Sequence, residues 1–274
     1  LGDVYKRQGS KYRVKAHDAD MNEVEATYGQ TDSGMTVIEG NLFLNGNKPI
    51  DQRSSYGLGE VLKAALDNQA EHIVMSLGGI GSFDAGAGML QALGAKFYDD
   101  EANIVDVSDG AYKIKYIRRI DLSNVHPRLA DAKLQLMSDF SSRLYGKQSE
   151  IMQTYQTFHL NQNEAAEIDN LVWYFSELFK SELKLAIGPI ERGGAGGGIA
   201  AVLKGLYQAE ILTSHELVNQ ITHLEDLIEQ ADLIIFGEGL KEKDQILETT
   251  TLRIADLTQK YNKPAIAICA TSDK

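Results

Sequence analysis

Cysteine and positive charge are both scarce in this sequence. Its single cysteine, Cys269, excludes a disulfide framework and a paired-cysteine metal site. The formal net charge of −12 argues against nucleic acid and against an anionic membrane surface as the main partner. No apolar run approaches the roughly 20 residues that a membrane-spanning helix needs. No signal peptide is recognisable. We therefore expect a cytoplasmic protein without a nucleic-acid or membrane partner.

Apolar residues, by contrast, are plentiful. They make up 43% of the 274 residues, enough to bury the core of one large domain or two ordinary ones. The acidic balance does not exclude a phosphate site, because backbone amides and one or two local cations can hold a phosphate. Residues 1–9 do not blend into the patterned segment after them, and we expect them to be a non-native leader on a chain truncated at both ends.

Hydrophobic patterning divides the chain near residue 187. Before it, the segments that carry Tyr12, Val14 and Ala16, then Val24, Ala26 and Tyr28, then Met35, Val37 and Glu39 alternate as short antiparallel strands do. Residues 163–183 have helical spacing. From Gly188 onward helices alternate with buried strands, including a helix over residues 217–230. The pattern from Gly188 onward predicts part of a doubly wound parallel sheet. The pattern before residue 187 predicts an α/β region with a mixed sheet.

The most informative stretch covers residues 72–95. Residues 73–77 form an apolar run typical of a buried strand. Glycines at 78, 79 and 81 permit positive φ and let backbone N–H groups face a ligand. After Asp84 the spacing becomes helical. A strand, a glycine turn and a helix start together predict an anion pocket, and a tight turn without a ligand is the alternative.

Glycine-rich turns accompany apolar strands at two further places, residues 193–198 and 237–239. Three such turns in one chain suggest backbone-lined pockets that converge where strands end, as in the ligand crevice of an α/β sheet. None of them matches G-x-x-x-x-G-K-[ST], and the turn at 193–198 lacks the strong preceding strand of a dinucleotide fingerprint.

Three acidic residues lie at or near the ends of expected strands: Asp84, Asp139 and Glu238. A carboxylate in that place can bind Mg²⁺ or take a proton from a substrate hydroxyl, although a helix cap or a solvated turn would also explain each one. Lys147, Arg192 and Lys241 are possible phosphate or carboxylate partners, with a solvated surface cation as the alternative.

Taken together, these turns resemble the bacterial type of glycerate kinase, whose sheet domain is split. That family runs a strand into L-G-G-S-A-T-N-D-G-G-A-G-M-L-Q-A-L-G, and residues 77–94 read L-G-G-I-G-S-F-D-A-G-A-G-M-L-Q-A-L-G. Similar matches occur in the family's order at S-Y-G-L-G-E (55–60), V-I-E (37–39), residues 139–146, R-G-G-A-G-G-G (192–198) and D-L-I-I-F-G-E-G (232–239). The resemblance extends from about Tyr12 to Ala270.

The resemblance implies transfer of a phosphoryl group from ATP, with Mg²⁺, to a hydroxyl of D-glycerate. It also implies a Rossmann-like domain built from both chain ends, with residues 188–274 as its C-terminal part and residues 10–187 as an inserted α/β domain. Asp84, Asp139 and Glu238 would be catalytic. The ligand loops would contain Gly78, Gly79, Gly81, Ser82, Gly194, Gly196, Gly197 and Gly237.

Departures from the family pattern leave other hypotheses open. The family's D-S-F-K and A-D-G-G-E-G motifs are absent, and Ile80 and Phe83 replace polar residues of the central loop. Ser142-Arg143 stands where the family has Asn-Pro. A catalytically impaired relative that binds a small hydroxy acid or nucleotide without turnover is one alternative. A kinase for a less polar hydroxy acid is the other.

Overall fold

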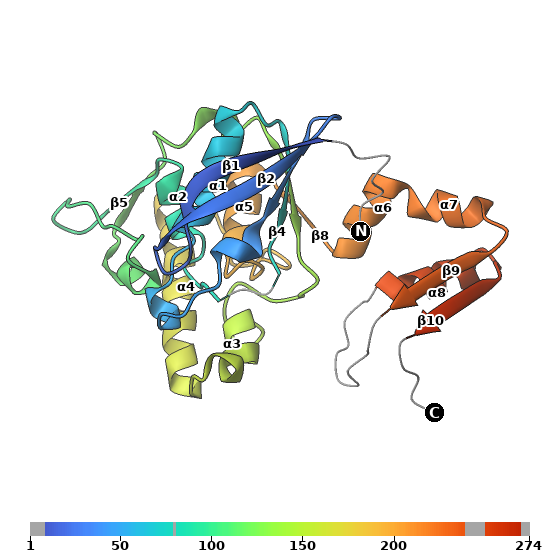
Figure 1. The fold of residues 1–274 in the computed structure, drawn as a ribbon. Coiled ribbons are helices and arrows are strands. Elements are labelled where there is room, and N and C mark those ends of the chain that lie inside the picture. Colours follow the sequence, from blue (N-terminus) through green and yellow to red (C-terminus); the bar gives the residue numbers. More distant parts are fainter. Residues whose placement is uncertain (1–8, 79–80, 239–249, 270–274) are drawn as a thin grey trace. The chain divides into compact units, whose positions relative to one another are not determined.

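The computed structural model describes residues 9–78, 81–238 and 250–269 (Figure 1). They form two compact units, the first ending at Ile211 and the second beginning at Leu212. The segment after Gly188 therefore packs with the first unit as far as Ile211. The division into an inserted domain, 10–187, and part of a Rossmann-like domain, 188–274, remains a prediction.

The first unit is built on a mixed six-stranded sheet with the order β1-β2-β3-β4-β7-β8 (Figure 1). Its strands are β1 (Gly9–His17), β2 (Glu23–Thr31), β3 (Met35–Glu39), β4 (His72–Ser76), β7 (Lys133–Met137) and β8 (Glu210–Leu212). β1, β2 and β3 pair antiparallel, whereas β3, β4 and β7 pair parallel. The predicted mixed α/β architecture is thus confirmed.

Helices cover this sheet where the sequence places apolar stripes. In the central strand β4 both faces are covered, because the consecutive residues Ile73, Val74 and Met75 are all buried. The longest helix begins after Asn161, which forms a capping box with Glu164, so the helix expected over 163–183 is confirmed. The helices of this unit are α1 (Tyr56–Asp67), α2 (Ala87–Ala92), α3 (Glu150–Thr154), α4 (Gln162–Glu182) and α5 (Ile199–Tyr207).

Short elements connect these helices and strands. They are the 3-10 turns η1 (Gly40–Phe43), η2 (Ile50–Gln52), η3 (Ala111–Tyr116), η4 (Pro127–Leu129) and η5 (Tyr155–Phe158), and the small hairpin of β5 (Lys96–Tyr98) with β6 (Arg119–Asp121). β3 departs from the expected alternation: Thr36 and Ile38 face the core, while Val37 is 41% exposed. Successive side chains point to opposite faces of a strand, so burying Ile38 turns Val37 outward.

In its described residues, the second unit contains a parallel strand pair and three helices. Its elements are α6 (Ser214–Thr222), α7 (Leu224–Gln230), β9 (Ile234–Glu238), α8 (Thr250–Lys260) and β10 (Ala265–Cys269), with β9 and β10 parallel. The single helix expected over 217–230 is wrong, because His223 takes a left-handed φ of 52° and ends α6. β9 is predicted from the sequence to be a buried strand, but it is not buried, because its residue Ile235 is 61% exposed.

Candidate functional site

Two of the three glycine turns pack against each other in the first unit. We call residues 78–88 the first glycine turn and residues 193–198 the second. The amide of Ala85 donates to the carbonyl of Gly197 over 3.0 Å. A Cβ built on Gly197 would lie 1.9 Å from the carbonyl oxygen of Ser82, and Gly197 has a φ of +59°. Only glycine allows both the conformation and the contact, so the turns are locked together by main chain.

The contact lies beside one edge of the sheet, where three parallel strands end together. Glu39 of β3 is level with Ser76 of β4, which is level with Met137 of β7. The first glycine turn leaves from this edge after β4, and Asp139 follows β7 at the same edge, where it is exposed. In α/β sheets, ligands bind in the crevice outside the carboxyl ends of such strands.

The third turn belongs to the second unit. Gly237 and Glu238 end β9, where Glu238 pairs with Cys269 of β10. Gly79, Ile80, Gly239 and Lys241 lie outside the described residues, as does the side chain of Glu238. The catalytic role expected for Glu238 stays a prediction.

Asp84 is completely enclosed. One of its carboxylate oxygens accepts hydrogen bonds from the Ser55 amide (2.8 Å), the Ser55 hydroxyl (2.8 Å) and the Gly88 amide (3.1 Å). The other oxygen accepts from the Gly86 amide over 2.9 Å. Burial raises the pKa of Asp84, and these hydrogen bonds oppose that rise. The carboxylate therefore ties the first glycine turn to the start of α1.

This arrangement changes the anion pocket that the sequence suggests. Free N–H groups at the start of a helix attract anions. Here the group that occupies this place is the carboxyl of Asp84, which accepts hydrogen bonds from the amides of Gly86 and Gly88. Gly78 comes before residues 79–80, which lie outside the described residues. A Cβ built on Gly78 would meet no described atom within 4 Å. Ser82 has a buried hydroxyl without a hydrogen-bond partner among the described residues.

A polar cavity adjoins the second glycine turn. It measures about 410 Å³ and is lined by Ser141, Ser142, Arg143, Gln148, Gln153, Glu191 and Arg192. The Gly194 amide donates to the Ser142 carbonyl over 3.2 Å, which joins the cavity wall to the turn. The hydroxyl of Ser142 is buried and has no hydrogen-bond partner among the described residues. Two guanidinium groups and an unsatisfied hydroxyl suit a small organic anion.

Sequence reasoning identified Arg192 but missed Arg143 and Ser142 as parts of a site. The cavity is assembled from segments around residues 142, 150 and 192, which are separated in the chain. The available signal was a pair of arginines, one beside Asp139 and one at the start of the second glycine turn, in a strongly acidic chain. Lys147, also suggested from the sequence, does not line this cavity.

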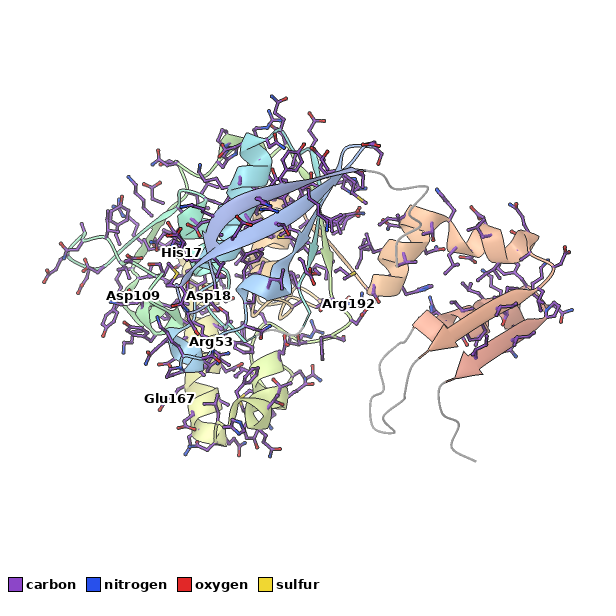
Figure 2. The ribbon with its side chains drawn as sticks, in the orientation of Figure 1. His17, Asp18, Arg53, Asp109, Glu167 and Arg192 are labelled. Carbon is purple, nitrogen blue, oxygen red and sulfur yellow. The ribbon has the colours of Figure 1, made fainter. Side chains whose placement is uncertain are left out.

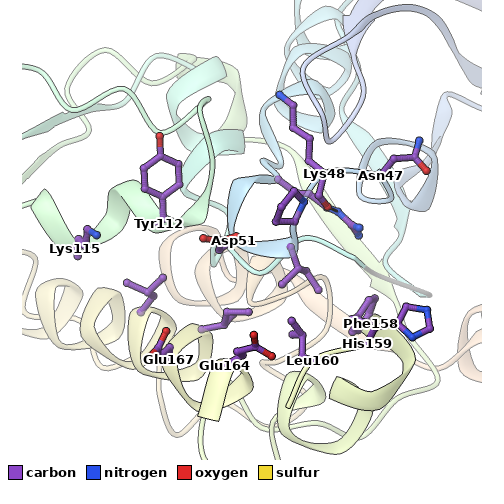
Figure 3. A pocket seen from close by; sticks show the side chains of 15 residues that line it. Asn47, Lys48, Asp51, Tyr112, Lys115, Phe158, His159, Leu160, Glu164 and Glu167 are labelled. Carbon is purple, nitrogen blue, oxygen red and sulfur yellow. Dashed lines mark hydrogen bonds between the residues drawn. The ribbon is translucent and has the colours of Figure 1, made fainter. Parts of the chain in front are cut away.

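A second, larger cavity has a lining that contacts the first glycine turn at Gly81 and Phe83. It measures about 770 Å³ and mixes charged and apolar side chains (Figure 3). We call it the amphipathic cavity. Its lining includes Arg53, whose guanidinium Nη1 donates to the Gly81 carbonyl over 3.0 Å. Phe158, also in the lining, packs edge-on against Phe83 with ring centroids 5.9 Å apart. Figure 2 labels one arginine from each cavity lining, Arg53 from the amphipathic cavity and Arg192 from the polar one.

The side chains of the described residues offer no metal site built from protein ligands alone. Among the described residues, no group of three or more His, Cys, Asp or Glu side chains could hold a metal ion. Mg²⁺ that arrives with a nucleotide needs only one or two carboxylates beside the phosphates, and a role of this kind for Asp139 stays a prediction. In the described part of the chain no helix has the length and apolarity needed to cross a bilayer.

Comparison with known proteins agrees with this geometry. The model of the glycerate kinase family matches residues 3–274. Glycerate kinase of Halalkalibacterium halodurans is 31% identical over 96% of this chain and 71% of its own length. Glycerate 2-kinase of Escherichia coli is 29% identical over 91% of this chain and 67% of its own. The crystal structure assigned to glycerate kinase 2 of Salmonella typhimurium LT2 superimposes with a TM-score of 0.86 at 27% identity, over 97% of this chain and 72% of that one. The chain belongs to the glycerate kinase family.

Proposed function

We propose that this protein transfers a phosphoryl group from ATP to a hydroxyl of D-glycerate. The observation that carries the proposal is the main-chain lock between the two glycine turns, next to a cavity with two arginines. The family membership supports it, since several relatives are named glycerate kinases. The cytoplasm remains the predicted compartment.

The polar cavity is the proposed place for the hydroxy acid. The guanidinium groups of Arg143 and Arg192 would bind the carboxylate, and the Ser142 hydroxyl would bond a hydroxyl or carboxylate oxygen. D-glycerate is small and polar throughout, which agrees with the size and lining of this cavity.

In the proposed reaction the substrate hydroxyl oxygen forms a bond to the γ-phosphorus while the bond from that phosphorus to the β,γ-bridging oxygen breaks. ADP leaves, and the hydroxyl proton passes to a carboxylate. Asp139, exposed at the sheet edge, is the proposed acceptor. Magnesium that arrives with ATP would supply charge neutralisation at the phosphates. Asp84 would act by positioning the first glycine turn, because its carboxylate is enclosed.

The alternative of a kinase reshaped for a less polar acid rests on Ile80 and Phe83, which replace polar residues of the central loop. Phe83 does not support it. Phe83 is only 3% exposed and packs against Phe158, so it fills the core next to the amphipathic cavity instead of lining the polar one. The alternative of binding without turnover keeps the same packing between the two turns, so only an assay of turnover distinguishes it from the proposed reaction.

A coupled assay of ADP formation tests the proposal. With ATP and Mg²⁺, adding D-glycerate should give saturable ADP formation. Arg143→Met and Arg192→Met should each raise the KM for D-glycerate about tenfold or more, the effect of losing one charge-assisted hydrogen bond. Arg13→Met is a matched control, because Arg13 pairs with Glu25 on the exposed surface, away from the cavity lining. If ATP raises the melting temperature but no hydroxy acid releases ADP, the protein binds without turnover and the proposal is wrong.

A further inference from the structure

The amphipathic cavity is larger than the polar cavity proposed for glycerate, and its lining is more apolar. Its volume of about 770 Å³ lies within the roughly 300–1,000 Å³ that pockets for drug-sized ligands occupy. The polar cavity, about 410 Å³, already offers the arginines that a small carboxylate needs. The reaction has a second and bulkier substrate, the phosphoryl donor, which needs a site of its own.

The walls of the amphipathic cavity are chemically divided. Glu164 and Glu167 stand on α4 along one wall, and Lys48 lies across from them (Figure 3). Glu164 uses one oxygen to accept the Asn161 amide over 2.7 Å. Between the charged groups the lining is apolar and aromatic, with Ile50, Leu160, Leu171, Tyr112 and Phe158 among its residues.

These features match the parts of a nucleoside. A base is flat and apolar on its faces, and aromatic side chains stack on such faces. Its ring edge carries N–H donors, which carboxylates accept. The attached phosphates are anionic and attract cations, and of the three cations in the lining, Lys48, Arg53 and Lys115, Arg53 is bonded to the first glycine turn.

Arg53 connects this cavity to the first glycine turn. Its Nε donates to the Lys48 carbonyl over 2.8 Å, and its Nη1 donates to the Gly81 carbonyl over 3.0 Å. Phosphates that extend from the cavity past Arg53 would therefore come to Gly81. The turn begins at Gly78, where a Cβ would meet no described atom within 4 Å.

We propose that the amphipathic cavity binds the nucleoside of the phosphoryl donor, while the polar cavity beside the second glycine turn binds the acceptor acid. This inference rests on the proposed function and deepens it, because it assigns the two substrates to two separate cavities. The amphipathic cavity contacts the first glycine turn through Arg53 and Gly81, and the polar cavity contacts the second through Ser142 and Gly194.

A cavity-filling substitution tests the inference in the whole protein. Leu171→Trp places a large ring in the cavity from the half-buried face of α4, and Asn170→Trp is the control on an exposed position of the same helix outside the lining. Calorimetry should show ATP binding about tenfold weaker in L171W and unchanged in N170W. Inorganic tripolyphosphate, which has no nucleoside, should bind both variants as it binds the wild type. The KM for D-glycerate should stay within about twofold.

A second variant covers the case in which Leu171→Trp does not fold. Tyr112→Ala removes an aromatic side chain from another part of the lining, and it should weaken ATP binding several-fold without weakening tripolyphosphate binding. The inference is overturned if both folded variants bind ATP like the wild type, or if the KM for D-glycerate rises instead. If both variants turn over D-glycerate and bind ATP as tightly as the wild type, the inference about the cavity is wrong and the proposed function stands. If the variants weaken ATP binding but the wild type shows no turnover with D-glycerate, the proposed function is wrong and the inference about the cavity stands.

Discussion

Replacing Asp84 by asparagine separates a positioning carboxylate from a catalytic one. The change keeps the size of the side chain but replaces one acceptor oxygen with an NH₂ group. The best placement leaves the amide oxygen toward Ser55 and Gly88 and turns the NH₂ group toward the Gly86 amide, which now donates to the carboxylate over 2.9 Å. Two donors then face each other inside a fully buried site.

The magnitude can be worked out from the bonds that change. A buried donor left without an acceptor costs about 1–3 kcal/mol, and hydrogen bonds to charged groups contribute about 1.5–3 kcal/mol against about 0.5–1.5 kcal/mol for neutral ones. One bond is lost and three become neutral, so we expect Asp84→Asn to lower the free energy of unfolding by about 3 kcal/mol. Part of each weakened bond is recovered by relaxation, so the contributions do not add fully.

Urea unfolding followed by circular dichroism measures this difference, and Asp139→Asn is the matched comparison. Asp139 is exposed, so its substitution should change the free energy of unfolding by less than about 0.5 kcal/mol. The same substitution should lower kcat about 100-fold or more if Asp139 accepts the hydroxyl proton. A D84N protein as stable as the wild type would refute the structural role of Asp84. A D139N protein with unchanged kcat would refute the assignment of the proton acceptor.

Four further substitutions test the turns and the titration of a buried acid. Gly197→Ala should destabilise the protein by more than about 2 kcal/mol in urea unfolding, because its Cβ would meet the Ser82 carbonyl at 1.9 Å. Gly34→Ala, at a φ of +87° with no atom within 4 Å, should cost only about 1 kcal/mol, and equal costs would contradict the packing of the turns. Gly78→Ala, whose Cβ meets no atom of the described residues within 4 Å, should keep the melting temperature and weaken ATP binding; an unchanged affinity would remove Gly78 from the phosphate site. Burial raises the pKa of Glu150 from 4.5 to about 7, so the folded protein keeps a proton that the unfolded chain releases between these values. Stability should therefore fall by about 3 kcal/mol as pH rises through that window, and Glu150→Gln should abolish the fall, whereas equal pH profiles would place the titration elsewhere.

The sequence was sufficient for features that depend on local pattern. The capped, regularly spaced α4 and the two glycine turns of the first unit could be predicted because a helix cap, a 3.6-residue period and a need for positive φ are all written in neighbouring residues. The break at His223 was not visible, because apolar residues at helical spacing continue on both sides of it. Only the backbone shows that His223 adopts a left-handed conformation.

Features that depend on distant residues could not be predicted. The spacing around Asp84 fits both a cap and a catalytic acid, and what distinguishes them is Ser55, 29 residues earlier in the chain. The polar cavity likewise combines Arg143 with Arg192, which only the folded chain brings together. The amphipathic cavity had no sequence signal, since its charged, apolar and aromatic residues come from the loop before α1, from η3 and from α4.

Phosphorus NMR of one reaction mixture tests the central claim most directly. The purified protein is incubated with ATP, Mg²⁺ and D-glycerate, and the spectrum is followed over time. We predict a new phosphomonoester resonance that grows in step with ADP, and its coupling to protons identifies the hydroxyl that receives the phosphoryl group. Release of ADP with inorganic phosphate alone, or a spectrum that does not change, would contradict phosphoryl transfer to the acid.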